Sequence, residues 1–142
     1  MLKLLIDTNV ILDVVLERGQ AGVEGALLLS AIQSGDADGC VAAHSITTTH
    51  YIIARAADDA TARLAVTYLL QILSVVPLGG DDFHAAIALD VPDFEDAVQI
   101  AAALAAQADY IVTGNKKDFK RSPVTVRSAG ELLPLLRGLK QR

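Results

Sequence analysis

Residues 93–119, which read DFEDAVQIAAALAAQADYIVTGNKKDF, decide the fold of this chain. Asp93 is a good helix N-cap because its carboxylate can accept from a first-turn N–H, and Asp96 adds negative charge beside the positive end of the helix dipole. The alanine-rich, nearly apolar run from 97 to 108 predicts a buried helix. Residues 109–113 then read as a β-strand, followed by a Gly-Asn turn. The stretch therefore predicts a helix–strand unit with acids near its ends.

The rest of the chain alternates short apolar runs with helical patterns. Strands are predicted at 2–6, 40–43, 75–76 and 124–126, and helices at 10–15, 21–34, 46–57, 59–73, 81–89 and 131–137. Gly19 is predicted to break the first helix, and the inward face of the second is predicted to hold Ala26, Leu27, Leu29 and Ile32. Strands that alternate with helices favour an α/β sandwich with a mostly parallel sheet and right-handed crossovers.

Length and composition restrict the class of protein. A chain of 142 residues that is 52% apolar is expected to form one domain, 1–142, with a sizeable core. The single cysteine, Cys40, excludes an intrachain disulfide and fits a reducing cytoplasm. The first apolar run stops at Asp7, too early for a signal peptide, and no run is long enough for a membrane span. The net charge of −5 argues against a generic basic nucleic-acid binder.

Oxygen-bearing side chains are expected at the edge where the parallel strands end, which is where open α/β sheets bind ligands. Asp7 follows the first strand, and Asn115 lies in the turn after the strand of the quoted stretch. Asp96 reaches this edge if its helix begins there, and Asp118 is three residues beyond Asn115. The sequence thus predicts a cluster of Asp7, Asp96 and Asp118, with Asn9 and Asn115 as neutral oxygen donors.

Clustered carboxylates favour a divalent cation, because like charges in a partly buried pocket are costly unless a positive charge lies among them. Mg²⁺ prefers oxygen ligands, keeps several waters and often bridges to a substrate phosphate. A cation of this kind can deprotonate water and stabilise charge on phosphorus. His44 and Ser45 follow the second strand and are expected at the same edge.

Three segments resemble the PIN domain family. They are DTNVILD at 7–13, DFEDAVQIAAA at 93–103 and TGNKKDF at 113–119, in the family's order and at suitable spacing. The last two are fairly specific together, whereas DTN alone is weak. The similarity covers essentially the whole chain and is greatest to the small single-domain type that includes VapC-like toxins of toxin–antitoxin pairs.

The resemblance implies an α/β/α sandwich and a Mg²⁺- or Mn²⁺-dependent endoribonuclease that hydrolyses RNA with metal-activated water and no covalent enzyme intermediate. It places the family's metal-binding acids at Asp7, Asp96 and Asp118, and a catalytic Asp-or-Asn position at Asn115. It also implies a homodimer and, for toxin members, a small antitoxin protein that blocks the site.

One position departs from the family pattern. The helix after the second strand usually carries a Glu, and counting along SITTTHYI from Ser45 places His50 there. Histidine suits Mn²⁺ and softer metals better than Mg²⁺, so the departure bears on metal preference and activity. Glu95 and Asp93 are the candidates to compensate.

Several residues around the predicted cluster have both a functional and an ordinary interpretation. Thr113 is a candidate to orient a carboxylate through its hydroxyl group, and Lys116 and Lys117 are candidates to contact RNA phosphates. The ordinary interpretation of the two lysines is a solvated loop. Asp93 is first of all a helix cap, as is Asn9, and either is a second-layer candidate at the site.

Two alternatives to an active ribonuclease remain open at this stage. One is a catalytically weak relative that acts by binding RNA or a protein partner, as His50 suggests. The other is an aspartyl-phosphate enzyme with Asp7 as nucleophile, which the Asn at position 9 disfavours because such enzymes resemble a D-x-D pattern. Dinucleotide-binding and Walker A glycine patterns are absent from the sequence.

Overall fold

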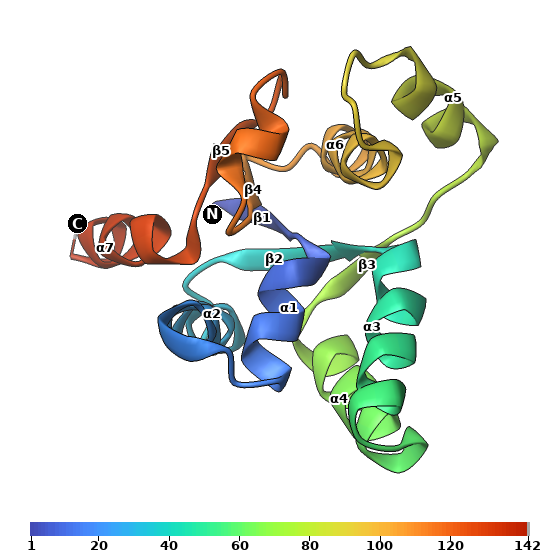
Figure 1. The fold of residues 1–142 in the computed structure, drawn as a ribbon. Helices are drawn as coiled ribbons and strands as arrows, with labels where there is room; N and C mark the ends of the chain where they lie inside the picture. Colours follow the sequence, from blue (N-terminus) through green and yellow to red (C-terminus); the bar gives the residue numbers. More distant parts are fainter. Residues whose placement is uncertain (142) are drawn as a thin grey trace.

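A central sheet organises residues 1–141, the part of the chain that the computed structural model describes (Figure 1). Arg142, the last residue of the predicted 1–142 domain, lies outside the described residues. The elements follow in the order β1 (Lys3–Ile6), α1 (Thr8–Val15), α2 (Gly19–Gln33), β2 (Asp38–Ala42), α3 (Ala43–Ala56), α4 (Asp59–Ile72), β3 (Ser74–Val76), α5 (Gly80–Ala88), α6 (Phe94–Ala106), β4 (Tyr110–Val112), the 3₁₀ helix η1 (Lys116–Phe119), β5 (Thr125–Arg127) and α7 (Ala129–Lys140).

Within residues 1–141 the sheet has five strands in the order β3-β2-β1-β4-β5, and every neighbouring pair is parallel. The first strand of the chain is therefore the central one, with Leu5 opposite Cys40 of β2 and Ile111 of β4. Residues 4–6 of β1 and 111–112 of β4 are buried and apolar, as the residues of central parallel strands usually are. The predicted α/β/α sandwich is confirmed, with a sheet that is wholly parallel.

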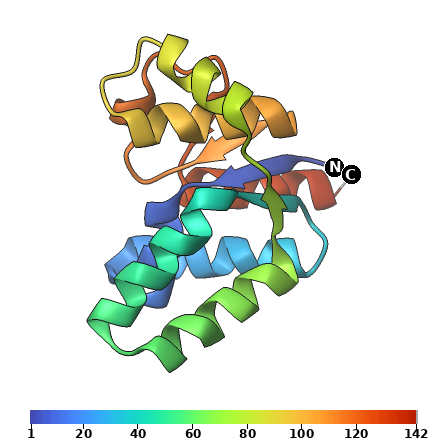
Figure 2. The same cartoon turned by 90° about the vertical axis from the view of Figure 1, so that its right-hand side faces the viewer.

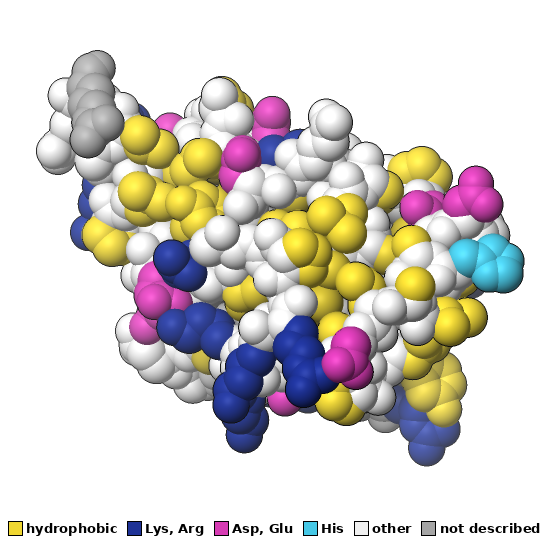
Figure 3. Space-filling view, turned by 90° about the horizontal axis from the view of Figure 1, so that it is seen from above, with side chains coloured by type: hydrophobic (Ala, Val, Ile, Leu, Met, Phe, Trp, Pro, Cys, Tyr) yellow, Lys and Arg dark blue, Asp and Glu magenta, His cyan; other side chains and the backbone are white. Residues whose placement is uncertain are grey.

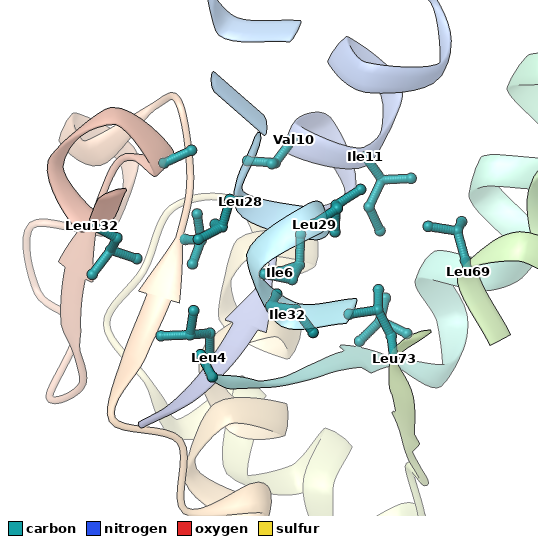
Figure 4. Packing of buried hydrophobic residues seen from close by; sticks show 14 of the residues in the cluster. Leu4, Ile6, Val10, Ile11, Leu28, Leu29, Ile32, Leu69, Leu73 and Leu132 are labelled. Carbon is teal, nitrogen blue, oxygen red and sulfur yellow. The ribbon is translucent and has the colours of Figure 1, made fainter. Parts of the chain in front are cut away.

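Helices cover both faces of the sheet, because successive strand residues point to opposite sides. Leu4 and Ile6 of β1 join a core cluster with α1, α2, α4 and α7, whereas Leu5 packs on the other side with Ile100 of α6. Figure 1 shows α5 and α6 on one side of the sheet and α1 to α4 on the other. Figure 4 shows the larger cluster, in which Leu28, Leu29 and Ile32 of α2 gather around β1.

The inward face of α2 differs from the one predicted. Leu29 and Ile32 are buried, but Ala26 is exposed and Leu27 is 51% exposed, so these two assignments were wrong. The buried stripe instead runs through Gly22, Gly25, Leu28, Leu29 and Ile32. A Cβ on Gly25 would lie 2.7 Å from Cγ2 of Val14, which shows how closely α2 approaches α1. The glycines carry the contact, and a pattern of apolar side chains does not reveal it.

Capping side chains fix where three helices begin. Asp93 accepts from the backbone N–H of Asp96 at 3.1 Å at the start of α6, as predicted. Asp58 does the same for α4, and Ser128 forms a capping box with Glu131 for α7. These short-range bonds set the entry of each helix onto the sheet.

Among residues 1–141, no helix combines the length and the apolar character that a membrane crossing requires.

Candidate metal-binding acidic edge

The carboxyl ends of the central strands form one edge of the sheet, and the predicted site residues follow them directly. Asp7 follows β1, Thr113 follows β4, and α3 begins immediately after β2 with His44 in its first turn. In Figure 2 the central strand β1 runs from the N-terminus toward the left, where α1 and α6 also begin. The first turn of α6, which carries Glu95 and Asp96, is thereby brought to the same edge.

Asp7 is the most buried acid of this edge, with only 2% of its surface exposed. Its backbone N–H donates to the carbonyl of Val112 at 3.0 Å, and its Oδ2 accepts from Oγ1 of Thr113 at 2.8 Å. The side chain therefore bonds to Thr113, the residue directly after β4, and does not cap α1. Burial raises the pKa of Asp7 to about 6, although the Thr113 hydroxyl opposes the rise and the charge of Glu95 adds to it.

Asp96 lies in the first turn of α6 and carries the larger pKa shift. Burial comes first among the causes, followed by the charges of Asp93, Glu95, Asp7 and Asp118, and together they raise its pKa to about 7. The charges of Asp7 and Asp118 both act on Asp96, so these two acids lie within electrostatic reach of it. Such a group of carboxylates is stabilised when a cation lies among them.

Asn115 and Asp118 occupy the exposed part of the edge. Asp118 belongs to η1, which is anchored by buried Phe119, and its N–H donates to the carbonyl of Asn115 at 3.0 Å. The N–H of Asn115 in turn donates to Oγ1 of Thr113 at 3.1 Å. Thr113 thus joins the loop to Asp7. Asn9 is also exposed, in the first turn of α1.

A buried polar network lies behind the acids. Oγ1 of Thr8 donates to Oγ of Ser45 at 2.7 Å, and Nε2 of Gln99 reaches Oγ of Ser45 at 2.9 Å and Oε1 of Glu95 at 2.9 Å. Nε2 of His44 lies 3.0 Å from the same Oε1. Burial alone would raise the pKa of Glu95, but the hydrogen bonds from His44 and Gln99 outweigh it, and the pKa lies below its ordinary value. Glu95 is held as an anion.

Sequence reasoning missed the central member of this network, Gln99. Its signal was present: a lone amide in the apolar interior of α6, four residues after Glu95 and on the same helix face. His44 and Ser45 were expected at this edge, but without a role. Glu95 was a candidate to compensate for the departure at position 50, and the structure brings it to the acids.

His50 lies apart from this network. Its Nε2 is 2.9 Å from Oδ1 of Asp59, the first residue of α4, and Oδ2 of that carboxylate accepts from Nε of Arg63 at 2.7 Å. His50 lines a hollow between α3 and α4 with Ile46. The histidine whose charge acts on Asp7 is His44.

The residues present fit a hard divalent cation. Asp93, Glu95 and Asp96 each offer a carboxylate oxygen, and these oxygens lie within 4.8 Å of one another. Asp7 adds a carboxylate that burial alone disfavours as an anion. Oxygen ligands without sulfur or paired imidazoles suit Mg²⁺ and Mn²⁺.

Basic side chains flank the exposed part of the edge. Nζ of Lys116 bonds Oε1 of Glu131 at 2.8 Å, so this lysine is held against α7. Lys117 lines a hollow beside Asp118 together with Lys120 and Arg121. Arg121 forms an ion pair with Asp90 across that hollow. Viewed from above, Lys and Arg side chains gather along one edge of the molecule, with acidic side chains among them (Figure 3).

An all-parallel sheet between two helical layers, with carboxylates gathered where its strands end, defines a three-layer α/β/α protein with an acidic, cation-suited edge. The family model of the PIN domain matches residues 3–117, and this chain belongs to that family. Asp7, Asp96 and Asn115 lie within the matched residues, and Asp118 is the first residue beyond them.

Solved structures share the fold. One chain of the DNA-bound VapBC complex from Salmonella typhimurium matches with a TM-score of 0.71 and 15% identity, over 91% of this chain and 99% of that one. A chain of VapBC2 from Rickettsia felis, bound to a DNA fragment from its promoter, matches with a TM-score of 0.70 and 15% identity, over 89% of this chain and 98% of that one. A chain of FitAcB from Neisseria gonorrhoeae matches with a TM-score of 0.63 and 15% identity, over 91% of this chain and 99% of that one. No curated protein matches the chain in sequence.

Proposed function

We propose that this protein is a metal-dependent endoribonuclease that hydrolyses RNA phosphodiester bonds, and that it serves as the toxin of a toxin–antitoxin pair. The observation that supports the proposal most strongly is the electrostatic repulsion among the carboxylates of the acidic edge. Asp7 is nearly fully buried, and the charges of four acids, Asp7 among them, add to burial in raising the pKa of Asp96. A fold that gathers carboxylates at this cost is explained by a cation and a phosphate that they serve.

In this proposal Asp7, Asp96 and Asp118 hold Mg²⁺ or Mn²⁺, and Asn115 contributes a neutral oxygen. A cation bound there supplies an activated water and screens the negative charge that develops on the scissile phosphate. Thr113 fixes the direction of the Asp7 carboxylate through its 2.8 Å hydrogen bond. Asp93 serves α6 as its cap and, through its charge, makes the Asp96 carboxylate more dependent on a nearby cation.

Lys117 is proposed to contact RNA beside the scissile phosphate, because it lines the hollow next to Asp118. Lys116 is proposed to contribute less, since its ammonium group is already engaged by Glu131. The net negative charge of the chain makes such local positive groups the natural contacts for a polyanion.

The partners of the protein are part of the same proposal. The structural likeness to chains of VapBC complexes supports a small antitoxin protein as a binding partner, and the family resemblance supports a homodimer. Co-expression of the chain with its neighbouring reading frame, followed by co-purification and light scattering, tests both assignments.

The test of the activity is cleavage of structured RNA by the purified protein with Mn²⁺ or Mg²⁺. Asp7→Asn and Asp96→Asn are expected to lose at least about 100-fold in rate, since even outer-layer changes at metal sites cost about 10- to 100-fold. Asp81→Asn, an exposed acid in the first turn of α5, is the matched control and is expected to cleave normally. Cleavage that persists in both site variants would assign the activity to another site or a contaminant.

A second candidate function rests on position 50. His50 bonds Asp59 of α4 and supplies no carboxylate at the position expected to carry one, which favours a catalytically weak protein that acts by binding RNA or a protein partner. Calorimetry with Mn²⁺ separates the two candidates. Absence of binding to the wild type, with no gain in His50→Glu, would support the binding protein over the nuclease.

A further inference from the structure

Gln99 is the one polar side chain in the buried middle of α6, and it is fully buried. Its neighbours along the helix are Val98, Ile100 and a run of alanines. Burying an amide costs free energy unless its groups are hydrogen-bonded. The position of Gln99 therefore requires an explanation in terms of its partners.

The partners of Gln99 converge on its amide nitrogen. Nε2 lies 3.1 Å from Oγ1 of Thr8, 2.9 Å from Oγ of Ser45 and 2.9 Å from Oε1 of Glu95. An amide nitrogen has two hydrogens, and an ionised carboxylate only accepts, so the bond to Glu95 must be donated by Gln99. The amide oxygen is buried and has no hydrogen-bond partner among residues 1–141. The hydrogen bonds of Gln99 are therefore made by Nε2, and its amide oxygen makes none within the described part of the chain.

The same oxygen of Glu95 receives a second donor. Nε2 of His44 lies 3.0 Å from Oε1, and it must carry its hydrogen on that nitrogen to bond an anion. Thr8 approaches the same atom at 3.5 Å. Within residues 1–141, no hydrogen bond reaches the other oxygen, Oε2. One oxygen of Glu95 is thus fixed by the protein, and the other is left available.

We propose that Gln99 and His44 are positioning residues: they hold Oε1 of Glu95 so that Oε2 is presented to the cation that Asp7 and Asp96 also bind. Glu95 then supplies the carboxylate that position 50 lacks. This inference rests on the proposed metal-dependent function. It is supported by the carboxylate oxygens of Glu95, Asp93 and Asp96, which lie within 4.8 Å of one another.

The role has a simple physical basis. A free glutamate side chain has three rotatable bonds, and ordering it at a metal costs conformational entropy. Donors that already fix one oxygen remove that cost before the cation arrives, as outer-layer partners do at metal sites. Ser45 and Thr8 support Gln99 in turn, so the carboxylate is tied to α1 and α3 as well as to its own helix.

The test is a double-mutant cycle read by Mn²⁺ calorimetry on the full chain. Gln99→Met keeps the shape of the side chain and removes the donor, and it is expected to weaken Mn²⁺ binding by about 10- to 100-fold. In a Glu95→Ala background the same change is expected to have no further effect, because Gln99 acts through Glu95. Thr49→Val is the control: it removes a fully buried polar group of α3 that bonds neither Gln99 nor Glu95, and it should leave Mn²⁺ binding unchanged.

His44→Ala is the second variant. The ring is partly exposed, so its removal perturbs the core less than a change at Gln99, and it should weaken binding in the same direction. The inference is overturned if folded Gln99→Met or, should that variant not fold, His44→Ala binds Mn²⁺ like the wild type. It is also overturned if Gln99→Met weakens binding equally with and without Glu95. Failure of the wild type itself to bind Mn²⁺ would instead overturn the proposed function.

Discussion

The acidic edge has a buried part and an exposed part, and the two are built differently. Asp7 and Gln99 are almost completely buried and are bonded to residues of other elements. Asp118 and Asn115 are exposed and are bonded to their own loop. The buried part is therefore fixed by the fold and strained by its own charge, whereas the exposed part costs little stability and is adjustable. This difference predicts distinct effects of mutation on stability and on cation binding.

The largest expected effect on stability is at Asp7. A folded-state pKa raised from 3.8 to about 6 means that the folded protein prefers the protonated carboxyl, which corresponds to about 3 kcal/mol lost above pH 6. Asp7→Asn removes the charge and keeps an acceptor for Thr113. Without metal at pH 8 it is expected to raise the free energy of unfolding by about 2 to 3 kcal/mol, measured by urea denaturation. A less stable variant would contradict the assignment of strain to this carboxylate.

The pH dependence of the metal-free protein follows from the same shifts. Stability is expected to fall as the pH rises from about 4 to about 7, because Asp7 and Asp96 both have raised pKa values and must ionise against burial and repulsion. Mn²⁺ at 100 times its dissociation constant should restore about 2.7 kcal/mol at pH 8. Thermal melting at pH 5 and pH 8, with and without Mn²⁺, measures both effects. Asp7→Asn is the control: it should make the fall in stability smaller, because only Asp96 still ionises with a raised pKa, and it should abolish the gain from Mn²⁺.

The parts of the fold and site that the sequence predicted are those encoded locally. Asp93 caps α6 three residues before Asp96, and Asp7 directly follows β1. Each of these features can be predicted from a few consecutive residues of the sequence. Gln99 could not be assigned in this way, because its partners Ser45 and Thr8 lie 54 and 91 residues away.

Two other features illustrate the same limit. Counting along a helix placed His50 at a site position, whereas its hydrogen bond is to Asp59 in the next helix. On α2, Gly22 and Gly25 form the contact with α1, and a residue without a side chain leaves no trace in an apolar pattern. Hydrogen bonds between residues close in sequence can be predicted from the sequence. Contacts between separate helices and strands depend on how these elements pack, which the sequence pattern does not show.

The exposed part of the edge is expected to respond in the opposite way from Asp7. Asp118→Asn removes an exposed carboxylate whose charge acts on Asp96, and the free energy of unfolding should change by less than about 0.5 kcal/mol. Mn²⁺ binding should nevertheless weaken, by about tenfold, because a cation loses one of its proposed ligands while the buried ones remain. Calorimetry and urea denaturation on the same preparation separate the two readouts. A stability loss as large as the change at Asp7 would show that the two parts of the edge are not independent.

The smallest expected effect distinguishes the two lysines of η1. Lys117 lines the hollow beside Asp118, and Lys116 is held by Glu131 on α7. If Lys117 contacts an RNA phosphate, Lys117→Ala should reduce the slope of log affinity against log salt by about 0.7, the value for one contact on a single strand. Lys116→Ala should leave that slope unchanged and alter stability by less than about 1 kcal/mol, as expected for an exposed ion pair. Both lysine changes are made in a protein that also carries Asp7→Asn, so that the RNA is not cleaved. Filter binding of RNA to these variants, over a range of salt concentrations, gives both slopes. If neither variant changes the slope, the two lysines form an ordinary solvated loop, and the RNA is recognised by other parts of the molecule.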